Sequence, residues 1–272
     1  MTAGPPAAGG AAGEGRYGED LFEAERPGEA ERIDAAAVAY DPFTTRRLRA
    51  LGVGRGGRCL DVGAGTGTVT RWLLERPGVA EVVALDRDTS ALGALVDPRV
   101  RVLNADITDE SLRLGTFDLV HARFVLMHLP GRRGLISRLA HRLNPGGLLV
   151  IADAVEVVDP LDASSAYRRV MDAMWRALRS TIGTDTSSVP AYPRFLREEG
   201  LCDVAAELFC PPLVAGSPLA RFWSETWNRM RPELEATGEV DGAVIDEALA
   251  YLASPGFAEL GPGMLMAWGR QP

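Results

Sequence analysis

Short apolar segments alternate with longer amphipathic segments along the chain from residue 58 to residue 152. The short segments are rich in Val, Leu and Ala, as is typical of parallel strands buried on both faces. The segments between them repeat apolar residues at helical spacing, so they predict helices that cover the sheet. The pattern predicts strands at residues 58–62, 81–85, 100–104, 117–121 and 148–152.

The rest of the chain adds helices and two more strands. Residues 17–51 have a helical pattern in which Asp41-Pro42 predicts a break. Further helices are predicted at residues 165–180, 219–230 and 244–252, and we expect the first of these to roof the site. Strands at 202–210 and 263–269 complete a seven-stranded, mostly parallel sheet of the α/β class, with helices on both faces.

This pattern divides the chain into three parts. Residues 1–15 are rich in Gly, Ala and Pro and bury almost nothing, so we expect a disordered tail. Residues 16–52 are predicted to form an N-terminal helical cap. Residues 53–272 are predicted to form the sheet core, with helical insertions at about 160–185 and 216–255.

Composition narrows the class of protein. The 272 residues are 46% hydrophobic, and no apolar run approaches the roughly 20 residues that span a bilayer. The start lacks the basic and apolar regions of a secretory signal, and Cys59, Cys202 and Cys210 are too scattered for disulfides or a metal cluster. All 29 positive charges are arginine, as a GC-rich genome favours, and the net charge of -8 disfavours nucleic acid as a partner. We therefore expect a soluble cytoplasmic protein without metal or membrane contact, and a homodimer is left open.

The segment from Asp61 to Gly67 leads from a strand through three alternate glycines into a helix. Glycines at Gly63, Gly65 and Gly67 allow positive φ angles and let a ligand approach the backbone, while unpaired N–H groups at the start of a helix attract anions. The spacing is D-x-G-x-G-x-G and not the G-x-G-x-x-G of dinucleotide sites. We interpret the segment as a cofactor-binding turn.

Two more acids follow the next two strands in register with this turn. Asp86 ends the second strand, where a carboxylate can accept hydrogen bonds from both ribose hydroxyls. Asp106 follows the third strand beside Ile107, where it can accept from the amine of an adenine. Either acid alone would fit a solvated turn or a helix cap, but together with the glycines they predict an adenosine site.

These motifs resemble those of the class I S-adenosylmethionine-dependent methyltransferases, and the resemblance covers residues 17–272. It implies a Rossmann-like fold and transfer of a methyl group from S-adenosylmethionine, which leaves S-adenosylhomocysteine, to a small-molecule acceptor of the secondary-metabolite kind. In this family Asp61 and the glycines line the methionine part, Asp86 the ribose, and Asp106 with Ile107 the adenine. The resemblance also assigns cofactor contacts to Ala64, Arg87, Ala122 and Arg123.

Small-molecule methyltransferases of actinobacterial type share a Tyr and a Glu-x-x-Arg pair before the core, here Tyr17, Glu29 and Arg32. The resemblance implies that Tyr17 and Arg32 bind the cofactor. Phosphobase methyltransferases pair such a tyrosine with a histidine at the position of His128, which makes His128 and Tyr17 the candidate catalytic residues. The chain departs from those enzymes at Phe124, where they have an acid. The alternative is that His128 is a local structural residue.

Candidate substrate residues follow the fourth and fifth strands and lie in the predicted insertion. His121 ends the fourth strand, where a structural role is the favoured alternative, and Asp153 follows the fifth strand, where a solvated loop acid is the alternative. Trp223 and Trp227 share one helical face and either pack in the core or wall an apolar substrate. Two other functions stay open: a non-methylating reaction such as a cyclisation, and cofactor binding without catalysis.

Overall fold

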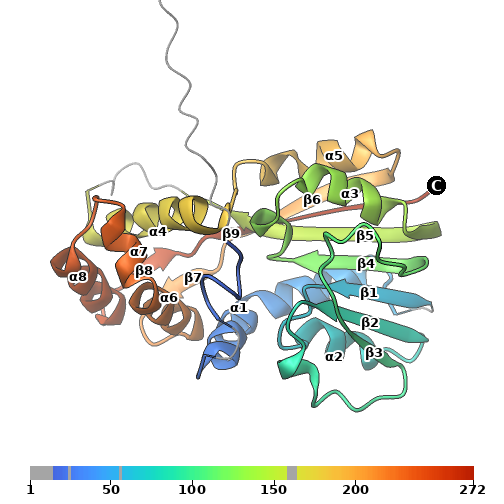
Figure 1. Ribbon diagram of the computed structural model, residues 1–272, viewed down its shortest axis with the longest axis horizontal. Helices are drawn as coiled ribbons and strands as arrows, with labels where there is room; N and C mark the ends of the chain where they lie inside the picture. Colours follow the sequence, from blue (N-terminus) through green and yellow to red (C-terminus); the bar gives the residue numbers. More distant parts are fainter. Residues whose placement is uncertain (1–14, 24–25, 55–56, 158–163) are drawn as a thin grey trace, which may run out of the picture.

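The computed structural model describes residues 15–23, 26–54, 57–157 and 164–272, so the predicted tail lies, except for Gly15, outside the described residues. Its main sheet has seven strands in the order β3-β2-β1-β4-β5-β9-β6 (Figure 1). The strands are β1 (Arg58–Val62), β2 (Glu81–Asp86), β3 (Val100–Asn104), β4 (Phe117–Arg123), β5 (Leu143–Val155), β6 (Cys202–Phe209) and β9 (Gly263–Arg270). The first five strands are parallel and β9 runs antiparallel between β5 and β6, which confirms the predicted seven-stranded α/β sheet.

The described chain also has eight α-helices, four beside the sheet and four beyond one end of it. They are α1 (Glu29–Ala50), α2 (Thr68–Leu74), α3 (Arg132–Ala140), α4 (Ala166–Ile182), α5 (Tyr192–Glu198), α6 (Pro218–Arg229), α7 (Arg231–Ala236) and α8 (Gly242–Ala253). The sheet lies between the pair α1 and α2 and the pair α3 and α5, and its central strands are almost wholly buried, as expected for parallel strands covered on both faces.

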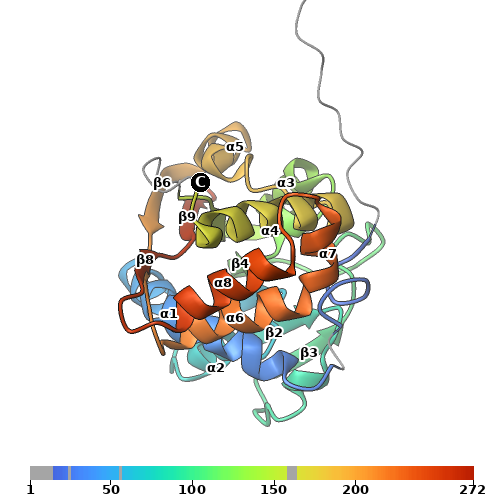
Figure 2. The same cartoon turned by 90° about the vertical axis from the view of Figure 1, so that its left-hand side faces the viewer.

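Helices α4, α6, α7 and α8 form a cap beyond one end of the sheet, at the left of Figure 1 and toward the viewer in Figure 2. Helix α1 packs against α6, and α4 packs against α8, so the N-terminal helix and the cap are continuous. A two-stranded sheet of β7 (Pro212–Val214) and β8 (Ala258–Leu260), which the sequence pattern did not predict, closes the cap. No helix of the described chain is long and apolar enough to cross a bilayer.

The N-terminal prediction was wrong in two respects. The described residues between 17 and 28 form turns and a bridge between Tyr17 and Leu21 rather than a helix, because Gly18 and Gly28 have positive φ angles. Helix α1 also continues through Pro42 without a break. Pro42 is exposed, so water can satisfy the carbonyl that loses its partner, and the buried rings of the flanking residues Tyr40 and Phe43 hold the helix in place.

Candidate active site

A cleft of about 440 Å³ lies at the carboxyl ends of the parallel strands, between the glycine turn and the cap. Parallel sheets bind ligands at this edge because the loops that follow the strands converge there. The cleft is lined by the turn after β1, the ends of β2 and β4, helix α1, and helices α4 and α6 of the cap.

The glycine turn forms the floor of the cleft. Its backbone is fixed by the end of β2, because Gly63 and Ala64 donate to the Leu85 carbonyl at 2.8 and 3.1 Å. Gly63, with φ 65°, packs so closely that a Cβ there would lie 2.2 Å from Val125 Cγ2. Gly65, with φ 54°, is different, since a Cβ there would meet no atom within 4 Å. The open space above Gly65 is therefore free for a ligand that touches the backbone.

Two carboxylates border the floor where the sequence predicted them. Asp86 accepts backbone hydrogen bonds from Gly65 at 2.7 Å and Asp88 at 3.1 Å, and burial raises its pKa. Asp106 accepts from the hydroxyl and the N–H of Thr108 at 2.6 and 2.8 Å. Burial pushes the pKa of Asp106 upward, but the bonds from Thr108 outweigh it and hold the pKa below its usual value. Both acids and the buried Ile107 line the cleft.

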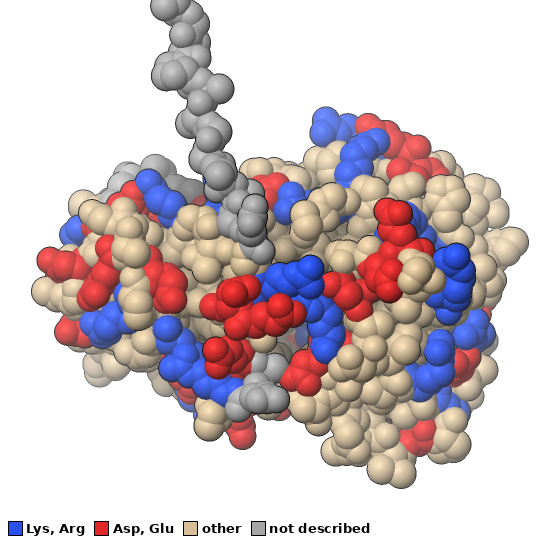
Figure 3. All heavy atoms as spheres, viewed as in Figure 1, with Lys and Arg blue, Asp and Glu red and all other residues tan. Residues whose placement is uncertain are grey.

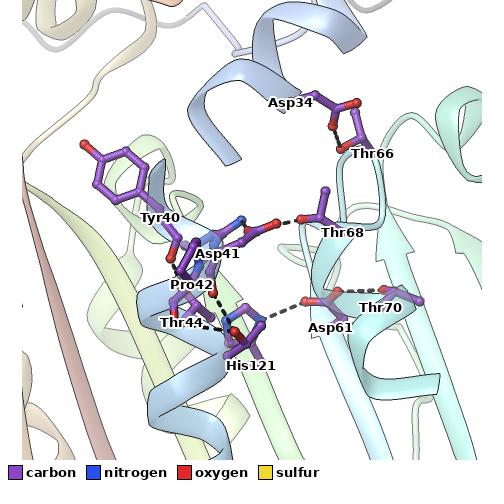
Figure 4. A network of polar contacts seen from close by, with 12 residues as sticks. Asp34, Tyr40, Asp41, Pro42, Thr44, Asp61, Thr66, Thr68, Thr70 and His121 are labelled. Atoms are coloured by element: carbon purple, nitrogen blue, oxygen red, sulfur yellow. Dashed lines mark hydrogen bonds and ion pairs between the residues drawn. The ribbon is translucent and has the colours of Figure 1, made fainter. Parts of the chain in front are cut away.

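Asp61 is engaged by the fold on both carboxylate oxygens (Figure 4). Its Oδ1 lies 2.8 Å from Nδ1 of His121 on the neighbouring strand β4, and its Oδ2 accepts from the Thr70 hydroxyl at 2.6 Å. His121 is 1% exposed, and its Nε2 has no hydrogen-bond partner among the described residues. Asp61 and His121 thus form a fixed buried pair in the cleft wall.

Helix α1 is bonded to the same region by a second set of polar contacts, also visible in Figure 4. Asp34 accepts from the Thr66 hydroxyl at 2.6 Å, on the glycine turn. Asp41 accepts from the Thr68 hydroxyl at 3.3 Å and pairs with Arg123 of β4 at 2.6 Å. The helix is therefore anchored to the floor of the cleft and not free to move as a separate lid.

The N-terminal segment 15–22 crosses the mouth of the cleft and brings Tyr17 into it. Arg16 pairs with Asp106 at 3.4 Å and Glu19 pairs with Arg87, so the segment contacts the side that holds the predicted adenosine site. At its start the Gly15 N–H donates to the Thr181 carbonyl of α4 at 3.1 Å. One short segment therefore bridges both sides of the cleft.

Arg32 organises a buried charged cluster at the back of this segment. It forms an ion pair with Glu29 through two hydrogen bonds of 2.9 and 2.5 Å and donates to the Tyr17 hydroxyl and to Thr226 of α6, each at 2.9 Å. Glu29 also pairs with Arg229 at 2.6 Å. Arg32 is 1% exposed, so this cluster ties the N-terminal segment, α1 and α6 together inside the protein.

His128 lies beside Tyr17, with 4.9 Å between the ring centroids. The two candidate residues contact each other through their rings and not through a hydrogen bond. The Tyr17 hydroxyl accepts from Arg32, and Nδ1 of His128 lies 2.9 Å from the Thr184 hydroxyl. Burial, helped by the positive charge of Arg132, lowers the pKa of His128 to about 4, so the imidazole is neutral near pH 7. Its Nε2 has no hydrogen bond within the described residues.

Buried contacts below His128 fix the turn that carries it. Asp153 accepts from the Met127 N–H at 3.1 Å and from the Tyr192 hydroxyl at 2.5 Å. Burial raises the pKa of Asp153 to about 7. Arg132 donates to the Leu126 carbonyl at 3.1 Å, on the same turn. The turn η2 (Leu126–His128) is thus held from below by side chains of β5, α3 and the segment after α4.

The structure brings most of the predicted site residues into the cleft and leaves four behind its walls. Those in the lining are Tyr17, Arg32, Asp61, Gly63, Ala64, Gly65, Asp86, Arg87, Asp106, Ile107, His121, Arg123, His128 and Trp223. Those behind it are Gly67, Ala122, Asp153 and Trp227. Trp227 is fully buried and packs edge-on against Tyr167, and Asp153 holds the His128 turn as described.

Sequence reasoning missed several apolar lining residues. They are Phe22, Ala36, Ala37, Tyr40, Trp175 and Phe222. Met174 and Leu178 also line the cleft, and they lie on α4, the helix that we expected to roof the site. No sequence signal distinguishes Phe22, whose position depends on the unpredicted turns before α1. No group of three potential metal ligands occurs within the described ranges.

Comparison with known proteins shows that the chain is similar to methyltransferases. A family model described as a methyltransferase domain matches residues 60–149. The chain is 24% identical over 263 residues to 27-O-demethylrifamycin SV methyltransferase of Amycolatopsis mediterranei, covering 94% of this chain and 87% of that protein. It is 35% identical over 182 residues to trans-aconitate 2-methyltransferase of Acidovorax sp., covering 66% and 64%. The chain spans about half the length of the first curated relatives that it matches.

Among solved structures, the chain is similar to phospholethanolamine N-methyltransferase 2 of Haemonchus contortus in complex with S-adenosylhomocysteine. The TM-score for this match is 0.54, at 17% identity. A second matched structure, from Bacillus halodurans, has a TM-score of 0.53, also at 17% identity. The Haemonchus match covers 91% of this chain and 59% of that one. At this identity the likeness supports the fold.

Proposed function

Because the chain belongs to the class I S-adenosylmethionine-dependent methyltransferases, we propose that it transfers a methyl group from this cofactor to a small-molecule acceptor of the secondary-metabolite kind. One observation carries the proposal: an open floor over Gly65, bordered by Asp86 and Asp106, continues into a chamber lined by the cap. The broad match to a methyltransferase whose name specifies a rifamycin substrate supports the acceptor class.

The residues of the floor fit the cofactor. Asp86 retains acceptor capacity on both oxygens for the ribose hydroxyls, and Asp106 beside Ile107 suits the amine and the apolar face of adenine. Arg32 makes four of the five hydrogen bonds that a guanidinium can donate, which leaves one N–H to donate to the cofactor's carboxylate. When bound, the cofactor supplies an electrophilic methyl group on a sulfonium.

We further propose that His128 takes the acceptor's proton. A histidine that acts as a base must be unprotonated and must present a lone pair to the cleft. With Nδ1 bonded to Thr184 and the imidazole neutral, Nε2 of His128 carries that lone pair if Nδ1 is the protonated nitrogen. Tyr17 packs against the ring and fixes its plane, and the closed N-terminal segment limits water at the reacting groups.

A small acceptor also fits the charge of the molecule better than nucleic acid does. The net charge is -8. On the face shown in Figure 3, acidic and basic side chains are intermixed and form no continuous basic surface. We propose that nucleic acid is not a substrate.

Cofactor binding by the floor is tested with Asp86→Asn and the control Asp109→Asn, which changes an exposed carboxylate outside the cleft lining. Each lost charge-assisted bond to a ribose hydroxyl is worth roughly 1.5 to 3 kcal/mol, so Asp86→Asn should weaken S-adenosylhomocysteine binding by at least tenfold in calorimetry. The control should bind as the wild type does. Affinity of Asp86→Asn within threefold of wild type would disprove the assignment of Asp86.

Transfer itself is tested by supplying S-adenosylmethionine with a deuterated methyl group and a panel of small hydroxyl compounds. Mass spectrometry should find S-adenosylhomocysteine and a methylated product in equal amounts, and neither with RNA in place of the panel. Cofactor that binds but is consumed without a labelled product would favour a non-methylating reaction.

A further inference from the structure

The part of the cleft that faces the cap, which we call the inner chamber, is apolar. Helices α4 and α6 and the turn after β4 supply its walls, with Phe124, Met174, Trp175, Leu178, Phe222 and Trp223. The polar residue that α6 adds to the lining, Thr226, already accepts from Arg32 and donates to the Phe222 carbonyl at 2.7 Å. Transfer of an apolar compound from water into the chamber is therefore favourable. Transfer of a charged compound is unfavourable, because the charge loses its hydration there.

The charged side chains that border the chamber are already paired with one another. Arg123 bonds Asp41 at 2.6 Å and Thr44 at 3.0 Å. Arg32 and Arg229 share Glu29. With the cofactor's carboxylate on the remaining N–H of Arg32, a carboxylate or phosphate on the acceptor would have to break one of these pairs to find a cation, and an ammonium would have to break one to find an anion. The border thus disfavours charged acceptors of either sign.

Two hydrogen-bonding atoms at the entrance of the chamber are complementary. Nε2 of His128 offers a lone pair under the tautomer assigned above. The Tyr17 hydroxyl accepts from Arg32, and burial raises its pKa, so it keeps a proton that no described residue accepts. The two rings lie 4.9 Å apart, centroid to centroid. A hydroxyl group is both donor and acceptor, so it matches the lone pair of Nε2 and the proton of Tyr17, which neither an ammonium nor an ether does.

We propose that the inner chamber binds a neutral, apolar compound with a free hydroxyl group between Tyr17 and His128, and that this oxygen is the methyl acceptor. The inference rests on the proposed function. In the reaction the hydroxyl proton moves to Nε2 of His128 and the oxygen forms a bond to the methyl carbon. The carbon–sulfur bond of the donor breaks to leave neutral S-adenosylhomocysteine, and the imidazolium returns its proton to water.

Binding to the chamber is tested separately from transfer, with S-adenosylhomocysteine saturating the protein. Calorimetry with 2-naphthol should show binding below 1 mM. 2-Methoxynaphthalene, which has the same ring system without the hydroxyl proton, should bind at least tenfold more weakly. Trans-aconitate and phosphoethanolamine should not bind at 5 mM. The inference is overturned if 2-naphthol fails to bind below 1 mM, if the methoxy compound binds as well, or if either charged probe binds more tightly.

A variant of His128 locates the hydroxyl. His128→Phe keeps a ring beside Tyr17 but removes the lone pair, so the preference for 2-naphthol over 2-methoxynaphthalene should fall at least fivefold. His141→Phe, which changes an exposed histidine at the end of α3, should keep the full preference. An unchanged preference in His128→Phe, with S-adenosylhomocysteine still bound, removes His128 from the hydroxyl site. If 2-naphthol binds as expected but no naphthol or alcohol of the panel is methylated, the proposed function fails and the chamber assignment stands.

Discussion

Burial keeps His128, the histidine that we propose as the base, in its neutral form. An isolated imidazole has a pKa near 6.5 and is partly charged in weakly acidic solution. His128 packs against Tyr17 and lies near Arg132, and both its burial and that positive charge favour the neutral ring, with a pKa of about 4. Because the native state holds this proton less tightly than the unfolded chain, the neutral form is complete above about pH 5.

The pH dependence of catalysis should reveal this shift. If His128 is the base, kcat/KM for a hydroxyl acceptor stays level from about pH 8 down to about pH 5.5 and falls only as the pH approaches 4. His128→Ala should lower kcat at least a hundredfold, because a positioned base contributes roughly 10² to 10⁴ in rate. His141→Ala is the matched control and should change neither quantity. An acid limb near pH 6.5, or full activity of His128→Ala, contradicts the assignment.

At the scale of elements, two glycines of the same turn, Gly63 and Gly65, have different functions. Gly63 lets the turn pack against Val125, and Gly65 keeps the floor of the cleft open. The alternate spacing of the glycines predicted the turn, but not which glycine serves packing and which serves a ligand. That distinction depends on where the β4 turn lies, and β4 is far away in the sequence.

Substitutions of the two glycines should therefore have different effects. Gly65→Ala adds a Cβ in open space at a positive φ, so it should cost only about 1 to 2 kcal/mol of stability but weaken cofactor binding at least tenfold. Gly63→Ala adds a Cβ 2.2 Å from Val125 Cγ2 and should cost more stability than Gly65→Ala. Urea unfolding and calorimetry measure the two quantities. Equal stability losses, or normal cofactor affinity in Gly65→Ala, would contradict this division.

The same scale separates what the sequence could predict from what it could not. Asp61, Asp86 and Asp106 were predictable because parallel strands end at one edge of the sheet, so acids at or just after the ends of neighbouring strands must meet there. The continuous helix through Pro42 was not, because the pattern cannot tell that Pro42 would face water. Asp153 and Trp227 were placed near the substrate by their sequence position. Which side of the cleft wall each side chain occupies depends on the packing of segments distant in sequence.

Across the whole molecule, the charged cluster around Arg32 joins the N-terminal segment, α1 and α6. Arg32 and Glu29 are almost wholly buried, and each has a further partner on α6, Thr226 or Arg229. A buried ion pair adds little net stability relative to an apolar pair, but removal of one member leaves a charge without compensation. The cluster therefore fixes how the cap meets the rest of the protein.

Glu29→Gln is expected to expose this dependence. It leaves the buried Arg32 and the partly buried Arg229 without their carboxylate, so the free energy of unfolding should fall by about 3 to 5 kcal/mol. Glu31→Gln, which changes an exposed neighbour on the same helix, should have almost no effect. Urea denaturation gives both values. A loss below 1 kcal/mol for Glu29→Gln would show that the cluster is not a stability determinant.

Hydrogen exchange should show which of the two segments that lie over the cleft, residues 15–22 and helix α1, responds to the cofactor. Since α1 is bonded to the glycine turn, cofactor should slow exchange mainly in residues 15–22 and leave α1 almost unchanged. Protection of α1 equal to that of the segment would mean that α1 and segment 15–22 close as one unit.

The bridging position of segment 15–22 also has a kinetic consequence. Through Arg16 and Glu19 the segment contacts the adenosine side, and through Tyr17 it contacts the acceptor side. A segment that covers both sides must move away before S-adenosylmethionine can enter. The acceptor site, which includes Tyr17, is then complete only after the cofactor has bound and the segment has returned. Turnover should then follow a compulsory order, with S-adenosylmethionine entering first and S-adenosylhomocysteine leaving last. Steady-state inhibition by S-adenosylhomocysteine would be competitive toward S-adenosylmethionine and noncompetitive toward the acceptor.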